Sequence, residues 1–187
     1  QFNIELKLLP AFPELTPPPK QFVELVMGIV RNQRLEDRVI IQSFNHPCLS
    51  YAKKNSKKVR TAVLVDRTLL NWVQVVEHLD ADIAAPHCHW ITSEWVRRLH
   101  QKKIRVIPWT ANTQKDWSRL IQMKVDGIIT DFPLQLRKFL QTSESFIPTV
   151  SVKKDVSERN PGSFHFLRVD AMQSYWYQLD CTTVLII

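Results

Sequence analysis

Short apolar segments alternate with amphipathic segments along residues 2–140, and this alternation constrains the fold more than any other feature. The clearest pair of apolar segments is 106–112 (VIPWTAN) and 125–133 (VDGIITDFP), each of which ends in polar residues. A buried parallel strand has this pattern when its carboxyl end opens onto a site. The amphipathic segment 114–123 between them completes a βαβ unit, and the rest of the chain repeats this unit.

Six strands are predicted, each followed by a helix, which indicates parallel βαβ units. The repeat averages about 23 residues, and eight repeats would close a barrel of roughly 200–250 residues. We therefore predict an α/β fold, an incomplete TIM (β/α)8-type barrel of about six βα units. A doubly wound sheet is the alternative, but the chain has no glycine-rich phosphate-binding turn after an early strand. The strands are expected to begin near residues 2, 39, 61, 82, 104 and 127, and the helices to cover 20–35, 47–55, 69–79, a segment following Thr92, 114–123 and 133–140.

The first predicted strand, residues 2–7, alternates strictly between apolar and polar side chains. Both faces of a strand in a parallel sheet are normally buried, so a polar face is unusual there. It is typical of a strand whose inner face lines a barrel mouth, or of an edge strand with a solvent face. The apolar residues are Phe2, Ile4 and Leu6, and the polar residues are Asn3, Glu5 and Lys7.

Composition narrows the class of protein without choosing a function. The 187 residues are 44% hydrophobic, enough for one sizeable core, and no apolar run approaches the 18 or so residues of a transmembrane helix. The net charge of +7 favours an anionic partner, although charge alone does not separate nucleic acid, lipid headgroups and phosphate esters. Three cysteines make a disulfide framework improbable and favour a reducing, cytoplasmic location. The chain starts inside a strand and without Met, so we expect missing upstream sequence, which leaves a targeting segment open.

Glycine is scarce, with three residues in the whole chain. Helices in α/β proteins usually end on a glycine with a left-handed backbone, yet the predicted helix ends near Lys103 and Lys124 offer lysine. Either these helix ends are strained or they use another geometry.

Two short motifs combine histidine and cysteine, His46-Pro-Cys48 and His87-Cys88-His89, as soft-metal sites do. Adjacent residues of an extended segment point to opposite faces. Cys88 is therefore not expected to join both neighbouring histidines in one metal site, if the segment is extended.

Four segments together resemble the glycerophosphodiester phosphodiesterase family: NIELK at 3–7, IQSFN at 41–45, PWTAN at 108–112 and VDGIITDFP at 125–133. They occur in the family's order and at its separations, over residues 2–140. The resemblance implies a TIM barrel of lipid and glycerol metabolism that hydrolyses glycerophosphodiesters to an alcohol and glycerol 3-phosphate with a divalent metal, usually calcium or magnesium. It also implies that the six predicted strands are strands 3–8 of the barrel.

The resemblance assigns roles to individual residues. A metal-ligand glutamate falls on Glu5, and Lys7 beside it would neutralise a phosphate oxygen. His100 lies on a helix where the family often has a histidine, and we expect it to pack. The remaining assignments are Ser43 and Phe44 lining the pocket, Trp109 as an apolar wall, Asn112 as a hydrogen-bond donor to glycerol or water, and Asp126 and Asp131 flanking the last strand, where Asp131 either belongs to the site or caps the next helix.

The chain also departs from the family pattern. The family's opening strands carry a His-Arg-Gly signature with a catalytic histidine, a Glu-x-Asp pair of metal ligands and a second catalytic histidine, and the sequence has no counterpart of these. Each positioned acid or base contributes about 10²- to 10⁴-fold. We therefore expect the chain alone to be nearly inactive and to hold a metal weakly. The alternative is a non-catalytic remnant or isoform that acts as an anion-binding or partner-binding module.

The predicted domains are a partial barrel at 1–142 and an appended tail at 143–187, partly disordered or packed on the barrel. An open six-stranded barrel would leave two strand edges unpaired. Either the apolar end of the tail, 183–187, covers one edge, or the chain forms a homodimer through its open edges. The expected ligand is a small anionic phosphodiester, and no nucleic acid is expected.

Overall fold

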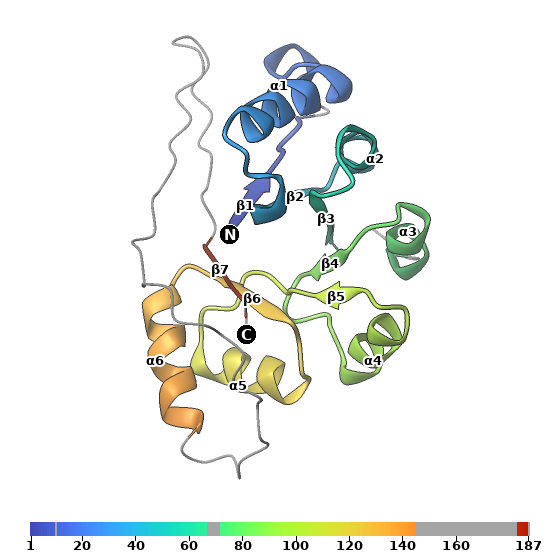
Figure 1. Ribbon diagram of the computed structural model, residues 1–187. Coiled ribbons are helices and arrows are strands. Elements are labelled where there is room, and N and C mark those ends of the chain that lie inside the picture. Colours follow the sequence, from blue (N-terminus) through green and yellow to red (C-terminus); the bar gives the residue numbers. More distant parts are fainter. Residues whose placement is uncertain (10, 67–71, 145–182, 187) are drawn as a thin grey trace.

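Strands and helices alternate in the computed structural model, which describes residues 1–9, 11–66, 72–144 and 183–186. Strands β1 to β5 form one parallel sheet in sequence order (Figure 1). The strands are β1 (Phe2–Glu5), β2 (Val39–Ser43), β3 (Arg60–Val65), β4 (Ile83–Pro86), β5 (Arg105–Val106), β6 (Gly127–Thr130) and β7 (Thr183–Ile186). The helices are α1 (Pro19–Asn32), α2 (His46–Asn55), α3 (Trp72–His78), α4 (Ser93–Gln101), α5 (Gln114–Gln122) and α6 (Pro133–Glu144), with 3-10 turns η1 (Pro13–Leu15) and η2 (Glu36–Arg38).

The α/β fold with six βα units is confirmed, with small differences in element length. β5 is shorter than the strand predicted from residue 104 because Pro108 has no N–H to donate to a neighbouring strand. Its continuation still pairs with the end of β4 at a single bridge between His87 and Trp109. The helix predicted over 69–79 begins, within the described residues, at Trp72.

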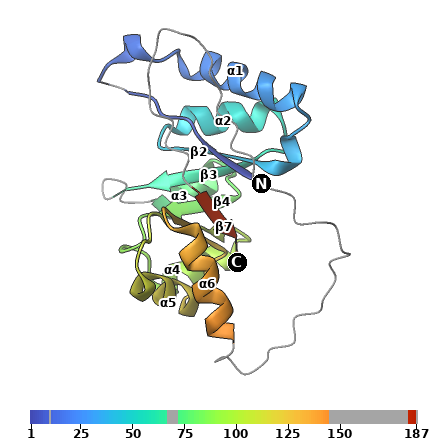
Figure 2. The ribbon, with the colours of Figure 1, turned by 90° about the vertical axis from the view of Figure 1, so that its left-hand side faces the viewer.

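The sheet curls toward a barrel, with the helices outside it (Figure 1). β6 lies beside the segment after β5: the Asp126 N–H donates to the Val106 carbonyl, and the Ile129 N–H to the Pro108 carbonyl, both at 2.9 Å. On its other edge β6 pairs antiparallel with β7, and β7 also contacts β1. In Figures 1 and 2 β7 lies beside the start of β1. The strand predicted at the end of the tail therefore exists and covers one edge; residues 145–182 of the tail lie outside the described residues.

Two layers of apolar side chains fill the structure, as alternation along the strands requires. Outward residues such as Val39, Ile41 and Val63 pack with the helices, and α1 and α2 lie side by side over β1 and β2 (Figure 2). The inward residues form a separate cluster around the barrel axis. They are Ile40, Ala62, Leu64, Ile83, Ala85, Ile107 and Ile129, with Trp109 packed against them.

Four helices end on a residue other than glycine with a left-handed backbone: Arg34, Asp80, Lys103 and Lys124, at φ values between 49° and 61°. The N–H of the next residue in each case bonds back across the last turn, for example from Val125 to the Leu120 carbonyl. This is the usual glycine-ended geometry, formed here without glycine. Of the two possibilities left open by the sequence, strain is the one that the structure adopts.

Candidate active-site rim

The carboxyl ends of the parallel strands meet at one edge, which we call the upper rim; their amino ends form the lower rim. β1 ends at Glu5, β2 at Ser43 and β6 at Thr130, so the residues that follow these strands lie at the upper rim. Active sites of (β/α)8 barrels lie at this edge. The predicted site residues that follow these three strands therefore lie at this edge.

The polar face of β1 lies on the inner side of the barrel. Asn3 lines a cavity of about 10 Å³ with inward residues such as Ile40, and its Nδ2 donates to the Gln42 Oε1 at 2.7 Å. Glu5 pairs in register with Gln42 at the end of the strand, and Lys7 follows as an exposed residue. The inner-face interpretation thus agrees with the structure, and the polar side chains lead to the upper rim.

Ser43 uses its hydroxyl to tie two strand ends together. Its Oγ donates to the Leu6 carbonyl at 2.6 Å and accepts from the Asn45 N–H at 3.0 Å, and the residue is fully buried. Asn45 then caps α2, with its side chain accepting from the Cys48 N–H at 3.2 Å. The serine thus positions the segment that carries Phe44, and its predicted contact with a ligand stays a prediction.

Three aromatic rings from three strand ends form a wall at the upper rim. The rings of Phe44 and Trp109 are perpendicular with centroids 5.6 Å apart, and the His87 ring lies 5.2 Å from Trp109. The Trp109 Nε1 donates to the Ala85 carbonyl at 2.6 Å, which fixes the indole. Phe44 remains 46% exposed, so this apolar surface is accessible from solvent.

Asn112 joins the segments that follow β5 and β6. Its Oδ1 accepts from the Thr130 hydroxyl at 3.1 Å and from the Asp131 N–H at 3.0 Å. Its Nδ2 donates to the Asp131 carboxylate at 2.6 Å. The structure therefore brings Asn112 and Asp131 together, and the second hydrogen of Nδ2 is left for another acceptor.

Asp126 lies at the lower rim, at the opposite end of β6 from Asp131. Its Oδ2 accepts from the Val106 N–H at 2.7 Å and lies 2.8 Å from the His100 Nε2. The structure does not bring Asp126 to the other predicted site residues. His100, which we expected to pack, makes a polar contact with this carboxylate at the surface.

The segment His87–Trp90 is a turn. The expectation that Cys88 does not join both histidines in one metal site held only for an extended segment, so it does not apply here. The Trp90 N–H donates to the His87 carbonyl at 3.1 Å, and the Cys88 N–H to the Trp109 carbonyl at 2.6 Å. His87, Cys88 and His89 consequently have their ligand atoms within 4.8 Å of one another. The sequence identified this motif but not the convergence of its side chains, because the short β4 gives no signal for where extension stops.

Comparisons with known proteins agree with the barrel fold. The model of the glycerophosphoryl diester phosphodiesterase family matches residues 2–135. The chain therefore belongs to this family, and the predicted resemblance is confirmed. A glycerophosphodiester phosphodiesterase from Caldanaerobacter subterraneus subsp. tengcongensis is 31% identical over 110 residues, which cover 59% of this chain and 45% of that protein.

Solved structures show the same fold. A Silicibacter pomeroyi DSS-3 protein of the same family name matches with a TM-score of 0.68 and 27% identity, over 75% of this chain and 50% of that chain. An Oleispira antarctica phosphodiesterase, solved with the product sn-glycerol-3-phosphate, matches with a TM-score of 0.65 and 18% identity, over 74% and 54% of the two chains. The present chain spans about half the length of the proteins it matches.

The family generally depends on a divalent metal, and the described residues do not by themselves fit a hard cation. Calcium and magnesium take six or more oxygen ligands, from several carboxylates or from carboxylates and water. In the described part of the chain, Glu5 belongs to no group of three or more potential ligands. Within the same part, no helix has the length and apolar character needed to cross a membrane.

Proposed function

We propose that this chain provides the glycerol phosphate-binding wall of a glycerophosphodiester phosphodiesterase and that, alone, it binds this group without hydrolysing the diester at a useful rate. The observation that carries the proposal is the contact of Phe44, which follows β2, with Trp109, which follows β5, on the rim where Lys7 follows β1. An apolar wall and a cation on the same rim suit a ligand with a carbon skeleton and a phosphate.

Each residue has a role in this proposal. The Lys7 ammonium binds a phosphate oxygen, and the net charge of +7 favours approach of the anion. Phe44 and Trp109 pack against the glycerol carbons, and Asn112 donates its second Nδ2 hydrogen to a glycerol hydroxyl or a water. Glu5 supplies one carboxylate of a metal site that needs further ligands. Ser43 positions Phe44 through its bond to the Leu6 carbonyl.

The proposed lack of hydrolysis is supported by the sequence of the 187 residues, which contains no His-Arg-Gly signature and no Glu-x-Asp pair. Two missing acid or base groups would lower the rate by about 10⁴-fold or more. A cytoplasmic location and a small anionic phosphodiester as ligand complete the proposal. The homodimer through open edges is the less favoured arrangement, because β7 covers an edge of β6.

Calorimetric titration with sn-glycerol 3-phosphate, the product bound in the Oleispira structure, tests the binding part. We expect saturable binding that weakens about tenfold in Lys7→Met, since a hydrogen bond to a charged group contributes roughly 1.5 kcal/mol or more. Lys57→Met is the matched control, because Lys57 is an exposed lysine in the loop before β3, at the lower rim. Equal losses in both variants, or no binding to the unmodified chain, would contradict the proposal.

Release of glycerol 3-phosphate from glycerophosphocholine, with calcium or magnesium present, tests the catalytic part. We expect background release from the 187-residue chain. A chimera that adds the family's opening strands from the Caldanaerobacter relative should release the product in a metal-dependent way. Measurable turnover by the chain alone would overturn the inactivity, and a folded but inactive chimera would favour the non-catalytic module.

A further inference from the structure

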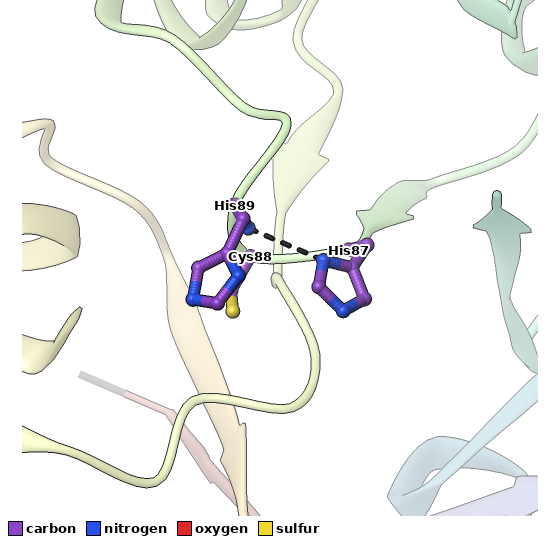
Figure 3. Close-up of side chains that lie close together, drawn as sticks. All are labelled: His87, Cys88 and His89. Atoms are coloured by element: carbon purple, nitrogen blue, oxygen red, sulfur yellow. Dashed lines mark hydrogen bonds between the residues drawn. The ribbon is translucent and has the colours of Figure 1, made fainter. Parts of the chain in front are cut away.

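Three potential metal ligands lie together in the turn after β4, beside the proposed pocket, where the His87 ring contacts Trp109. His87, Cys88 and His89 place one imidazole nitrogen or sulfur each within 4.8 Å of the others (Figure 3). Within the described residues no second group of three or more histidine, cysteine, aspartate or glutamate side chains is gathered in this way. The donor set of two nitrogens and one sulfur is the type that zinc prefers and that calcium and magnesium do not.

The turn explains why neighbouring residues converge. Its backbone is fixed at both ends, by the Cys88 N–H bonded to the Trp109 carbonyl and by the Trp90 N–H bonded to the His87 carbonyl. The Cys88 carbonyl also accepts from the Arg119 guanidinium at 2.7 Å. A turn held by three hydrogen bonds presents its side chains in a fixed arrangement, so little ordering is needed when an ion binds.

His89 has a partner that orients its ring. Its Nε2 lies 3.3 Å from the Asp116 Oδ1, and the other oxygen of Asp116 accepts from the Thr113 hydroxyl at 2.6 Å. Histidines that bind zinc commonly donate their second ring N–H to a carboxylate in this way. The contact leaves the His89 Nδ1 with its lone pair. His87 accepts the His89 N–H on its own Nδ1 at 3.3 Å, a long bond that a metal would replace.

We propose that His87, Cys88 and His89 bind a zinc ion, with Asp116 orienting His89 and a water as the fourth ligand. The Cys88 thiol gives its proton to the buffer as the sulfur–zinc bond forms, and its 3.4 Å contact with the Thr110 carbonyl is lost. The cluster opens to solvent on the His89 side, where that side chain is 62% exposed. Asp116 offsets the positive charge of Arg119, whose guanidinium lies 3.7 Å from it.

Cobalt(II) is the direct probe, because a cobalt–thiolate bond gives a charge-transfer absorption that nitrogen and oxygen ligands do not produce. Titration of the 187-residue chain under reducing conditions should give this absorption at one ion per chain, and zinc should displace it. Cys88→Ser should abolish the absorption. His89→Gln changes an exposed side chain and should weaken binding at least as much as Asp116→Asn, for which we expect a loss of about 10- to 100-fold.

Cys48→Ser and Cys181→Ser are the matched controls, because each removes one of the other two cysteines. Cys48 is fully buried in α2, where burial raises the pKa of its thiol to about 11. Both variants should keep the charge-transfer absorption. The proposal is overturned by an absorption that survives Cys88→Ser, by its loss in either control, or by no absorption from the unmodified chain. If Cys88→Ser does not fold, unchanged affinity in the soluble His89→Gln variant overturns it equally.

Discussion

Both rims of the barrel pair a basic side chain with an aspartate, but only the lower-rim aspartates also accept a backbone N–H from a neighbouring strand. Asp82, just before β4, accepts the Thr61 N–H of β3 at 2.7 Å and the Lys53 Nζ of α2 at 2.9 Å. Asp126, just before β6, accepts the Val106 N–H of β5 and contacts His100 of α4. The same three-part contact therefore recurs two βα units later.

At the upper rim, the aspartate that pairs with a basic side chain lies in a helix. Asp116 is the third residue of α5 and is held by Thr113, the residue that caps this helix. The hydrogen bond from Thr113 lowers the pKa of Asp116, while burial opposes this effect and the charges of His89 and Arg119 add to it. This carboxylate binds no backbone N–H of a neighbouring strand in the described structure. The difference indicates that lower-rim aspartates stabilise the sheet, whereas upper-rim polar groups remain available to ligands.

Removal of β7 should have the largest effect on the molecule, because both rims depend on a closed ring of strands. A chain that ends at Cys181 loses the antiparallel partner of β6 and the contact of β7 with β1. Exposed strand edges pair with other chains. We expect the full chain to be monomeric and the shortened chain to form dimers or larger species, as measured by size-exclusion chromatography with light scattering.

Leu134→Ser in the shortened chain is the control, because Leu134 is a large apolar residue that is 71% exposed on α6. Self-association through strand edges should persist in this variant. A shortened chain that remains a well-behaved monomer would show that β7 is not needed for closure.

The next test replaces, one at a time, the two aspartates that flank β6. Asp126→Ala leaves the N–H of the fully buried Val106 without its acceptor, which should cost about 1–3 kcal/mol of unfolding free energy. Asp131→Ala removes an exposed carboxylate, and the change in stability should stay below about 0.5 kcal/mol. Binding of sn-glycerol 3-phosphate should respond in the opposite order, since Asp131 holds the Asn112 amide.

Urea unfolding and calorimetric titration of both variants measure the two responses. Asn112→Ala should match Asp131→Ala in weakening the binding, because both remove the same hydrogen bond. The comparison between rims is wrong if folded Asp126→Ala loses affinity while Asp131→Ala keeps it.

The repeating pattern made the fold predictable, because buried strands and amphipathic helices leave a period in the sequence. The resemblance also selected Phe44, Trp109 and Asn112, and the structure brings Phe44 and Trp109 into contact. The bonds that carry the difference between rims were not predictable. Asp82 was not singled out, and Asp126 and Asp131 were both placed beside the last strand without their opposite roles, because their partners are a backbone N–H and an amide distant in sequence.

The left-handed helix ends were only half predictable. The scarcity of glycine identified Lys103 and Lys124 as unusual, but a sequence does not show whether a chain accepts strain or avoids it. Lys103 and Lys124 adopt the strained backbone because the residue after each must turn back into the core. Ile104 and Val125 are both buried and begin the path to β5 and β6. All four left-handed residues follow helix ends, so the strain lies at the lower rim.

Relief of the backbone strain at a helix end should have the smallest effect of the three tests. It should change the free energy of unfolding and leave ligand binding unchanged. Lys124 is exposed with φ 61°, a backbone that costs a side-chain-bearing residue roughly 1–2 kcal/mol and glycine almost nothing. Part of this gain is lost to the greater freedom of glycine in the unfolded chain, so Lys124→Gly should stabilise by about 1 kcal/mol in urea unfolding. Lys138→Gly removes an exposed lysine within α6 and should destabilise by a similar amount. Both variants should bind sn-glycerol 3-phosphate as the unmodified chain does, because neither residue lies at the upper rim; a change in affinity with Lys124→Gly would mean that the two rims are coupled through β6.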